Sequence, residues 1–358
     1  MLDLRDGAAV ADAFTTMKKT CFLTLIAAGA LMPMPMTSRG QSAGPVIGYY
    51  KVDVPAGQSA WVCGLVAMTE FQAQATSVAP GVPLADGTPT SVITQSSTSW
   101  SSPFPLHYVE ILSAGPTQGA VLDIIGSTAT TVRVRGAISG TPVFCIRKHA
   151  TLATIFKGLG GMVEFQDSLT LYNSDNSLSS YFPAGGGNWV AEDFFTPAND
   201  TVIYPGQGFI LSSTPDTVIT IGGGEVAYVK SGPTQVPLYR GQTNVVGPIT
   251  PLVATNPGDP LYGLTSTSTV AGGNLTLGSL GLTNSGLEEF VDSITLFLQG
   301  GDLNPSGSFY VGLGSVYADD FFTPADDALL RNGAAVIISA ESADRVWKQT
   351  PTYPGAGN

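Results

Sequence analysis

Two closely similar stretches, AEDFFTPAND at residues 191–200 and ADDFFTPADD at residues 318–327, indicate that part of this chain is repeated. Two further pairs precede them in the same order: TLATI (151–155) with TLGSL (276–280), and EFQDSLTLY (164–172) with EFVDSITLF (289–297). The copies are 125 residues apart at the second of these pairs (289 − 164) and 127 apart at the acidic pair (318 − 191), so the intervening loop gains two residues. Ordered matches with one loop insertion indicate an internal duplication.

The rest of the sequence is typical of a β protein. Gly (43 residues) and Pro (25 residues) interrupt short runs of Val, Ile, Thr, Leu and Tyr. Such runs indicate strands joined by tight turns. We expect an all-β, mainly antiparallel fold with three small sandwich- or barrel-like units, the last two being the duplicated pair. The predicted segments are a leader (1–43), an N-terminal β domain (44–150), β repeat copy 1 (151–235) and β repeat copy 2 (236–358).

Strand-like runs are frequent in the predicted N-terminal domain. Their number and spacing suggest a sandwich or a barrel. The run from Tyr108 to Leu112 alternates between apolar and polar residues, which predicts one solvent-facing side. The predicted strands are 46–54, 59–66, 91–94, 107–112, 121–125, 130–134 and 142–147.

The leader has the form of a secretory signal. Lys18 and Lys19 precede an apolar stretch at 21–31, and Ser42-Ala43 lies near a plausible cleavage point. The apolar stretch is shorter than the roughly 20 residues that a membrane-spanning helix needs. We therefore expect translation to start at Met17 and the mature chain to be exported to the extracellular space, the cell surface or the periplasm, with no transmembrane span.

Two cysteines follow the leader. Cys63 and Cys145 both lie in apolar, strand-like runs. In an oxidising compartment an even pair suggests a disulfide that ties the first and last strands of one domain. Two separate buried thiols are the alternative, and the sequence leaves both open.

The charge balance excludes several partners. The formal net charge is −12, and the longest basic cluster after the leader is Arg147-Lys148 beside His149. A nucleic-acid surface needs clustered Lys and Arg, so nucleic acid is not an expected partner. The low charge and high apolar content also exclude a generally disordered chain.

Part of the pattern resembles a known group of proteins. Trp189, the run PGQGF at 205–209 and the stretch from Tyr108 to Thr131 resemble an uncharacterised family of exported β-rich proteins, which we associate with verrucomicrobial and related bacteria. The resemblance implies export and a β fold but no catalytic residues. Copy 2 departs from the pattern, because Val316 stands in place of Trp189 and NGAAV (332–336) in place of PGQGF.

Motifs for catalysis are missing from the sequence. His107 and His149 are the only histidines, and neither belongs to a zinc-ligand pattern. The mature chain contains no Gly-x-Ser-x-Gly nucleophile motif. The sequence therefore predicts no enzyme, and no cofactor other than a calcium ion at the acidic turns.

The acidic turns allow three interpretations. Their oxygens could bind calcium, which takes six to eight oxygen ligands, or form a glycosidase carboxylate pair. In the third interpretation Asp side chains bond their own turn, Pro197 and Pro324 fix the backbone, and the paired Phe residues anchor the turn to the core. The candidate metal ligands are Glu192, Asp193, Asp200, Asp319, Asp320, Asp326 and Asp327.

Aromatic residues suggest a ligand site. Trp189, Tyr172 and Tyr181 flank a glycine-rich loop, and exposed aromatic rings on a β scaffold can stack on sugar rings. The alternative is that they fill space beneath that loop.

Taken together, the sequence favours an exported, non-enzymatic structural or adhesive protein of the cell surface or matrix. A polysaccharide-binding module centred on Trp189 and an exported hydrolase using the acidic turns are the alternatives. Surface polysaccharide and other matrix proteins are the expected partners, and the oligomeric state is left open.

Overall fold

The computed structural model describes residues 49–63, 69–97, 99–100, 103–173, 175–222, 232–249, 276–297, 305–328, 330 and 334–349. The predicted leader lies outside these residues. The prediction of an all-β fold is confirmed, because the described part of the chain is nearly all β, with antiparallel sheets that form sandwich- or barrel-like units. Within the described part, no helix has the length and apolarity that crossing a membrane requires.

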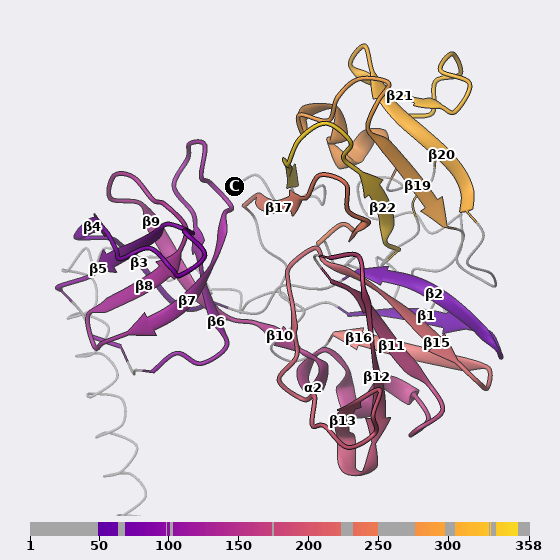
Figure 1. Cartoon of the computed structure of the whole chain (residues 1–358), viewed down its shortest axis with the longest axis horizontal. Helices are drawn as coiled ribbons and strands as arrows, with labels where there is room; N and C mark the ends of the chain where they lie inside the picture. Colours follow the sequence, from indigo (N-terminus) through magenta and orange to yellow (C-terminus); the bar gives the residue numbers. More distant parts are fainter. Residues whose placement is uncertain are drawn as a thin grey trace, which may run out of the picture. The chain divides into compact units, whose positions relative to one another are not determined.

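Residues 69–148 form a seven-stranded half-barrel (Figure 1). Its strand order is β3-β9-β6-β7-β8-β5-β4. Alternating side chains such as Val132 and Val134 point into a core that also contains Trp100 and Phe144. Its strands are β3 (Thr69–Gln74), β4 (Ser77–Pro80), β5 (Thr90–Thr94), β6 (His107–Ile111), β7 (Val121–Ser127), β8 (Thr131–Arg135) and β9 (Val143–Lys148).

The two strands that precede the half-barrel belong to a different unit. β1 (Tyr49–Val54) pairs with β16 (Thr217–Gly222), and β2 (Gln58–Cys63) pairs with β15 (Gly208–Ser213). Figure 1 shows both strands, in indigo, beside β15 and β16. The predicted N-terminal domain at 44–150 is therefore wrong at its start. The half-barrel is inserted into copy 1, between its second strand and residue 150.

We call the interrupted unit module 1. It has a two-stranded sheet, β1-β16, and a five-stranded sheet in the order β13-β12-β11-β15-β2. The other pair, β10-β14, is short. The remaining elements are β10 (Ala150–Thr151), α2 (Leu152–Ile155), η1 (Lys157–Gly161), β11 (Ser168–Tyr172), β12 (Leu178–Ala184), η2 (Gly185–Gly187), β13 (Asn188–Ala191) and β14 (Val202–Ile203).

Module 2 has the same arrangement of strands. Its first and last strands pair as β17-β23, and its five-stranded sheet has the order β21-β20-β19-β22-β18. It begins at residue 234 and its described part ends at 349. The elements are β17 (Thr234–Leu238), β18 (Asn244–Val246), η4 (Gly278–Leu280), η5 (Leu282–Asn284), β19 (Ser293–Phe297), β20 (Pro305–Gly312), β21 (Ser315–Ala318), β22 (Val336–Ser339) and β23 (Arg345–Gln349).

A buried aspartate holds the same place in each module. Asp167 precedes β11 and is 0% exposed; its carboxylate accepts hydrogen bonds from the Val163 and Thr214 amides at 2.7 and 2.8 Å and from the Ser213 hydroxyl at 3.0 Å. Asp292 precedes β19 and likewise accepts from the amides of residues 288 and 341. Each carboxylate therefore joins the turn before the central strand (β11 or β19) to the segment that follows the neighbouring strand (β15 or β22). This role explains why both copies have the sequence Asp-Ser at the start of the central strand.

The PGQGF run of copy 1 lies against module 2. A side chain at Gly208 would place its Cβ 2.6 Å from Val245 Cγ1 and 2.8 Å from Ala335 Cβ. Ile210, Val245 and Ala335 form a small buried cluster across this contact. Copy 2 has no further module in this position among the described residues, which explains why its corresponding run differs.

Two expectations from the sequence are wrong for the half-barrel. All five residues of β6 are buried, so it has no solvent-facing side. Glu110 points to the face away from the core and pairs with Arg147 at 2.7 Å, where both side chains are buried.

Cys145 is a buried free thiol in β9, whereas Cys63 lies on β2 in another sheet. The Cys63–Cys145 disulfide is therefore not formed, and the alternative of separate thiols describes Cys145.

The assignment of β1 and β2 to module 1 can be tested by truncation. A chain that starts at residue 69 lacks Val52, Val54, Ala60 and Val62, which are buried in the module 1 core. Burial of a large apolar side chain contributes about 1.5–3 kcal/mol, and whole domains are stable by only about 5–15 kcal/mol. We expect calorimetry to show loss of the module 1 transition and retention of the half-barrel transition, compared with a chain that starts at residue 44. Loss of the half-barrel transition would instead support the domain boundary at 44.

Candidate functional site

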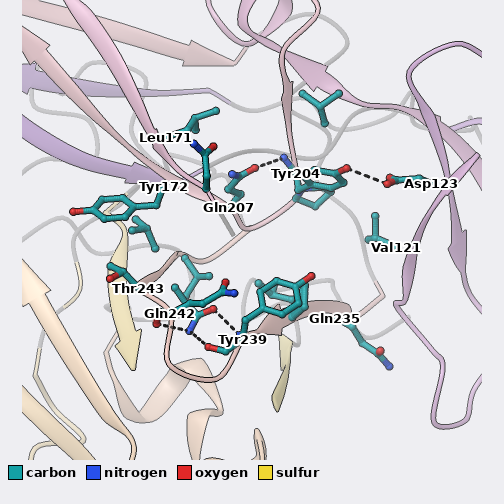
Figure 2. Close-up of a pocket in the computed structure, with 18 of the residues that line it drawn as sticks. Val121, Asp123, Leu171, Tyr172, Tyr204, Gln207, Gln235, Tyr239, Gln242 and Thr243 are labelled. Atoms are coloured by element: carbon teal, nitrogen blue, oxygen red, sulfur yellow. Dashed lines mark hydrogen bonds between the residues drawn. The ribbon is translucent and has the colours of Figure 1, made fainter. Parts of the chain in front are cut away.

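A pocket of about 530 Å³ lies where module 1, the half-barrel and the first strands of module 2 meet (Figure 2). Four tyrosines line it: Tyr172 and Tyr181 from β11 and β12, Tyr204 from the loop after β14, and Tyr239 from the loop after β17. Tyr204 and Tyr239 are 41% and 45% exposed, so much of each ring is open to a ligand. The polar lining residues include Asp123, Arg135, Asn173, Gln207, Gln235, Gln242, Thr243 and Asn244.

A tight turn positions Tyr204. The amide of Gln207 donates to the Tyr204 carbonyl at 3.0 Å, and Gly206 has a φ of 77°. Pro followed by Gly at the two central positions is the signature of a type II turn, which needs a positive φ at the second. The Gln207 side chain closes the turn, since its Oε1 accepts from the Tyr204 amide at 3.0 Å. The Tyr204 ring is thus held on a short, rigid loop.

Asp123 of β7 anchors the hydroxyl of Tyr204. The Tyr204 hydroxyl donates to Asp123 Oδ2 at 3.0 Å (Figure 2), and His149 Nε2 donates to Oδ1 at 3.0 Å. Burial opposes ionisation of Asp123, but the bonds and charge of His149 and the bond from Tyr204 outweigh it and lower the pKa of the carboxyl. Burial and the Asp123 charge raise the pKa of Tyr204, so its hydroxyl stays protonated.

A second loop positions Tyr239. The Tyr239 amide donates to Asn244 Oδ1 at 2.7 Å, and Asn244 Nδ2 donates to the carbonyls of Tyr239 and Gln242 at 3.0 and 3.1 Å. Asn244 thereby fixes the backbone of the loop between β17 and β18. The Tyr239 hydroxyl and the Gln242 amide group have no hydrogen-bond partner among the described residues, so both are available to a ligand.

The chemistry of the pocket suits a ligand rich in hydroxyl groups. Half-exposed aromatic faces can pack on apolar C–H groups. Side-chain amides and a carboxylate both accept hydrogen bonds, and the amides also donate them. A concave site with aromatic walls and a few convergent polar groups is the usual form of a small-ligand pocket.

Comparison with known proteins gives no identity. No family model, no curated protein and no solved structure matches this chain.

The structure separates the three aromatic residues that the sequence grouped as a ligand site. Tyr172 and Tyr181 do line the pocket. Trp189 does not, because it is 1% exposed and stacks on Phe156 in the core of module 1, with ring centroids 5.3 Å apart. The prediction of a polysaccharide site centred on Trp189 is therefore wrong, and Trp189 is the residue that fills space beneath the glycine-rich loop.

The acidic turns bond to themselves in both modules. Asp193 Oδ1 accepts from the Phe195 and Thr196 amides at 2.9 and 2.8 Å, and Oδ2 accepts from the Thr196 hydroxyl at 2.6 Å. Asp320 makes the corresponding bonds to residues 322 and 323. The Thr hydroxyl and then the backbone amides lower the pKa of both carboxyls. The structure thus fits the third interpretation, in which the aspartate bonds its own turn.

The other proposed ligands do not complete an ion site. Asp326 bonds within module 2, where its Oδ1 accepts from the Val316 amide at 3.0 Å and Oδ2 from the Ser315 hydroxyl at 2.5 Å. Glu192, Asp200, Asp319 and Asp327 are exposed. In the described part of the chain no three acidic, His or Cys side chains gather as a metal site would need. The calcium and glycosidase interpretations of these turns therefore gain no support from the geometry.

Sequence reasoning missed the residues at the centre of the pocket. Asp123, Tyr204 and Tyr239 lie on three segments that are far apart in the chain. Two local signals were present: the turn sequence Tyr204-Pro205-Gly206, and an aromatic residue, Tyr239, in a loop. His149, which the sequence places beside the basic pair Arg147-Lys148, is buried against Tyr108 and Tyr204 and supports Asp123.

Proposed function

We propose that this chain is an exported, non-enzymatic adhesive or matrix protein that binds a polysaccharide in the tyrosine-lined pocket. The observation that carries this proposal is the convergence of four tyrosines, Tyr172, Tyr181, Tyr204 and Tyr239, with one carboxylate and several side-chain amides. Among these amides, that of Gln242 has no hydrogen-bond partner in the described part of the chain. Sugars present alternating hydroxyl edges and apolar C–H faces, and the pocket offers a partner for each. Export rests on the secretory form of the leader and on the resemblance to exported β-rich proteins.

The composition of the pocket favours a saccharide over other ligand classes. A purely apolar ligand would bury the Gln242 amide and the Tyr239 hydroxyl without hydrogen-bond partners, which costs free energy. A nucleic acid needs clustered cations, whereas Arg135 is the only Lys or Arg among the lining residues and lies 3.6 Å from Asp86. A hydroxyl-rich ligand satisfies both the rings and the amides.

The same geometry supports binding without turnover. His149 is hydrogen-bonded to Asp123, which lines the pocket, and is itself buried. It therefore holds that carboxylate in place and does not reach a ligand. Asp193 and Asp320 are engaged in their own turns. Hydrolysis of the bound glycan by purified mature protein, lost in an Asp123→Asn variant, would contradict the non-enzymatic part of the proposal.

A glycan array followed by titration tests the pocket. Because the Tyr239 hydroxyl has no described partner and the ring is 45% exposed, Tyr239→Ala should leave the melting temperature unchanged. We expect this variant to bind the selected glycan at least about tenfold more weakly, which corresponds to about 1.4 kcal/mol. Tyr239→Phe keeps the stacking face and should lose less, and Gln242→Ala should also weaken binding.

Controls outside the pocket make the test specific. Val218→Ala changes an exposed apolar residue of β16 and should leave glycan affinity unchanged. Equal binding by wild type, Tyr239→Ala and Gln242→Ala would rule out the pocket as the site.

A further inference from the structure

Each module displays a cluster of aromatic rings on its surface. The rings in contact are those of Phe165, Phe182 and Phe194 in module 1, and those of Phe290, Tyr310 and Phe321 in module 2. We call each cluster, together with the next residue of its turn (Phe195 or Phe322), an aromatic turn. Phe195 and Phe322 are 87% and 85% exposed, so the expectation that the paired Phe residues anchor these turns to the core is wrong. Exposed rings gathered in this way mark interaction sites.

The ring geometry is the same in both modules. Phe182 and Phe194 have centroids 4.7 Å apart at 41°, and Tyr310 and Phe321 have centroids 4.6 Å apart at 46°. The neighbouring ring lies 6.3 Å from Phe194 in module 1 and 5.9 Å from Phe321 in module 2. These rings therefore correspond in the two sites, and module 2 adds Tyr317, whose ring centroid lies 5.7 Å from that of Phe290.

The backbone is strained at matching positions. Phe165 and Phe194 in module 1 have φ of 57° and 61°, and Phe290 and Phe321 in module 2 have 57° and 62°. Bulky residues rarely adopt a positive φ, and such strain persists only where the surroundings enforce it, often at binding sites. The hydrogen bonds of Asp193 and Asp320 hold the turns of Phe194 and Phe321, and those of Asp167 and Asp292 hold the turns of Phe165 and Phe290. The rings are thus held in place before a ligand binds, which lowers the entropy cost of binding.

The surroundings of the rings are acidic. Glu164, Glu192 and Asp193 are exposed in module 1, and Glu289, Asp319 and Asp320 are exposed in module 2. The stretches 163–167 and 191–200 contain no Lys or Arg, and neither do 288–292 and 318–327. In module 2 the Arg345 guanidinium lies 3.5 Å from the Glu288 carboxylate, which leaves Glu289, Asp319 and Asp320 as the exposed acids. A cationic ligand therefore complements these turns in charge, and ammonium groups also bind over aromatic faces.

Two equivalent sites on one chain suit a ligand that is itself repetitive. A polymer long enough to span both sites can occupy them together, and linked binding events strengthen each other without new contacts. A second copy of this chain is a poorer occupant, because its own net charge is −12 and the corresponding turns are acidic. An anionic membrane surface is disfavoured for the same reason.

We propose that the two aromatic turns are equivalent binding sites for an amino-sugar polysaccharide with free amino groups, such as a de-N-acetylated glucosamine polymer. The pyranose C–H faces pack on the exposed Phe rings, and the ammonium groups pair with the neighbouring carboxylates. These sites are separate from the pocket and do not depend on it.

Calorimetric titration of the mature chain with a glucosamine hexasaccharide tests this proposal. The Tyr239→Ala background removes the pocket contribution, so failure of the pocket and failure of the turns remain distinguishable. We expect about two hexasaccharides per chain in this background, about one after Phe195→Ser or Phe322→Ser alone, and none after both. Because both side chains are exposed, the melting temperature should not change. A long glucosamine polymer should bind the intact pair of turns about 100-fold more tightly than either single variant.

Two further ligands define the chemistry. The N-acetylated hexasaccharide should bind at least about tenfold more weakly, because it lacks the ammonium groups. Polylysine, which carries ammonium groups but no sugar ring, should bind by charge alone. Its affinity for the double Phe variant should therefore be within twofold of its affinity for the protein with both Phe residues. No binding of the glucosamine hexasaccharide, a stoichiometry unaffected by the Phe substitutions, or equal binding of the N-acetylated form would each overturn the proposal.

Discussion

Replacement of Trp189 by alanine is expected to lower the free energy of unfolding of module 1 by about 3–5 kcal/mol, the usual cost of removing a buried indole. The ring is 1% exposed, stacks on Phe156 and belongs to the same buried cluster as Leu169, Phe209 and Ile219. In a chain of several units, this change should shift the module 1 transition alone, by roughly 10 °C in differential scanning calorimetry.

A matched control is available for this experiment. Phe195→Ala removes a ring of comparable size that is 87% exposed, and it should leave the same transition within about 0.5 kcal/mol. An unchanged module 1 transition in Trp189→Ala, accompanied by loss of glycan binding, would restore the interpretation of Trp189 as a surface ligand residue.

Asp167→Ala should destabilise module 1 to a similar degree. It removes the acceptor of three hydrogen bonds from Val163, Ser213 and Thr214. A buried donor left without a partner costs about 1–3 kcal/mol, so we expect a loss of about 3–5 kcal/mol, measured as the shift of the same calorimetric transition.

Module 2 provides an independent version of the experiment. Asp292→Ala removes the acceptor of two amide bonds, and it also leaves Arg345, whose Nε lies 3.7 Å from the carboxylate, without that counter-charge. We expect a comparable loss, confined to the module 2 transition. Glu192→Ala alters an exposed acid and serves as the control. A loss below about 1 kcal/mol in both Asp variants would show that these carboxylates do not hold the modules together.

The apolar strands were predictable from sequence, whereas their partners were not. Runs such as 107–112 and 142–147 correspond to β6 and β9 because alternating or continuous apolar residues determine a strand locally. β3 was missed because its sequence, TEFQAQ, is mostly polar. The pairing of β1 and β2 across the inserted half-barrel depends on contacts between distant segments, which no local pattern encodes.

In the candidate sites, too, features set by local sequence were predictable and features set by distant contacts were not. The hydrogen-bonded Asp turn was among the predicted interpretations, since Asp followed by Thr and Pro has a local mechanism. The exposure of Phe195 was not predicted. It depends on the preceding residue, Phe194, whose φ of 61° is a conformation that phenylalanine rarely adopts. The two modules also bury tryptophan differently: Trp189 lies on β13 of module 1, whereas module 2 has Val316 on β21 and buries Trp347 of β23. Trp189 and Val316 are nevertheless buried at the same position of their strands, so the apolar residue of copy 2 was a signal that this position faces the core.

The most direct test of the proposed function is a crystal structure of the mature chain with the oligosaccharide that the glycan array selects. We expect sugar density in the pocket, packed on the Tyr204 and Tyr239 rings, with hydroxyl groups within hydrogen-bond distance of Asp123 and Gln242. Density for the intact sugar only at other surfaces, with the pocket unoccupied at saturating ligand, would contradict the proposal.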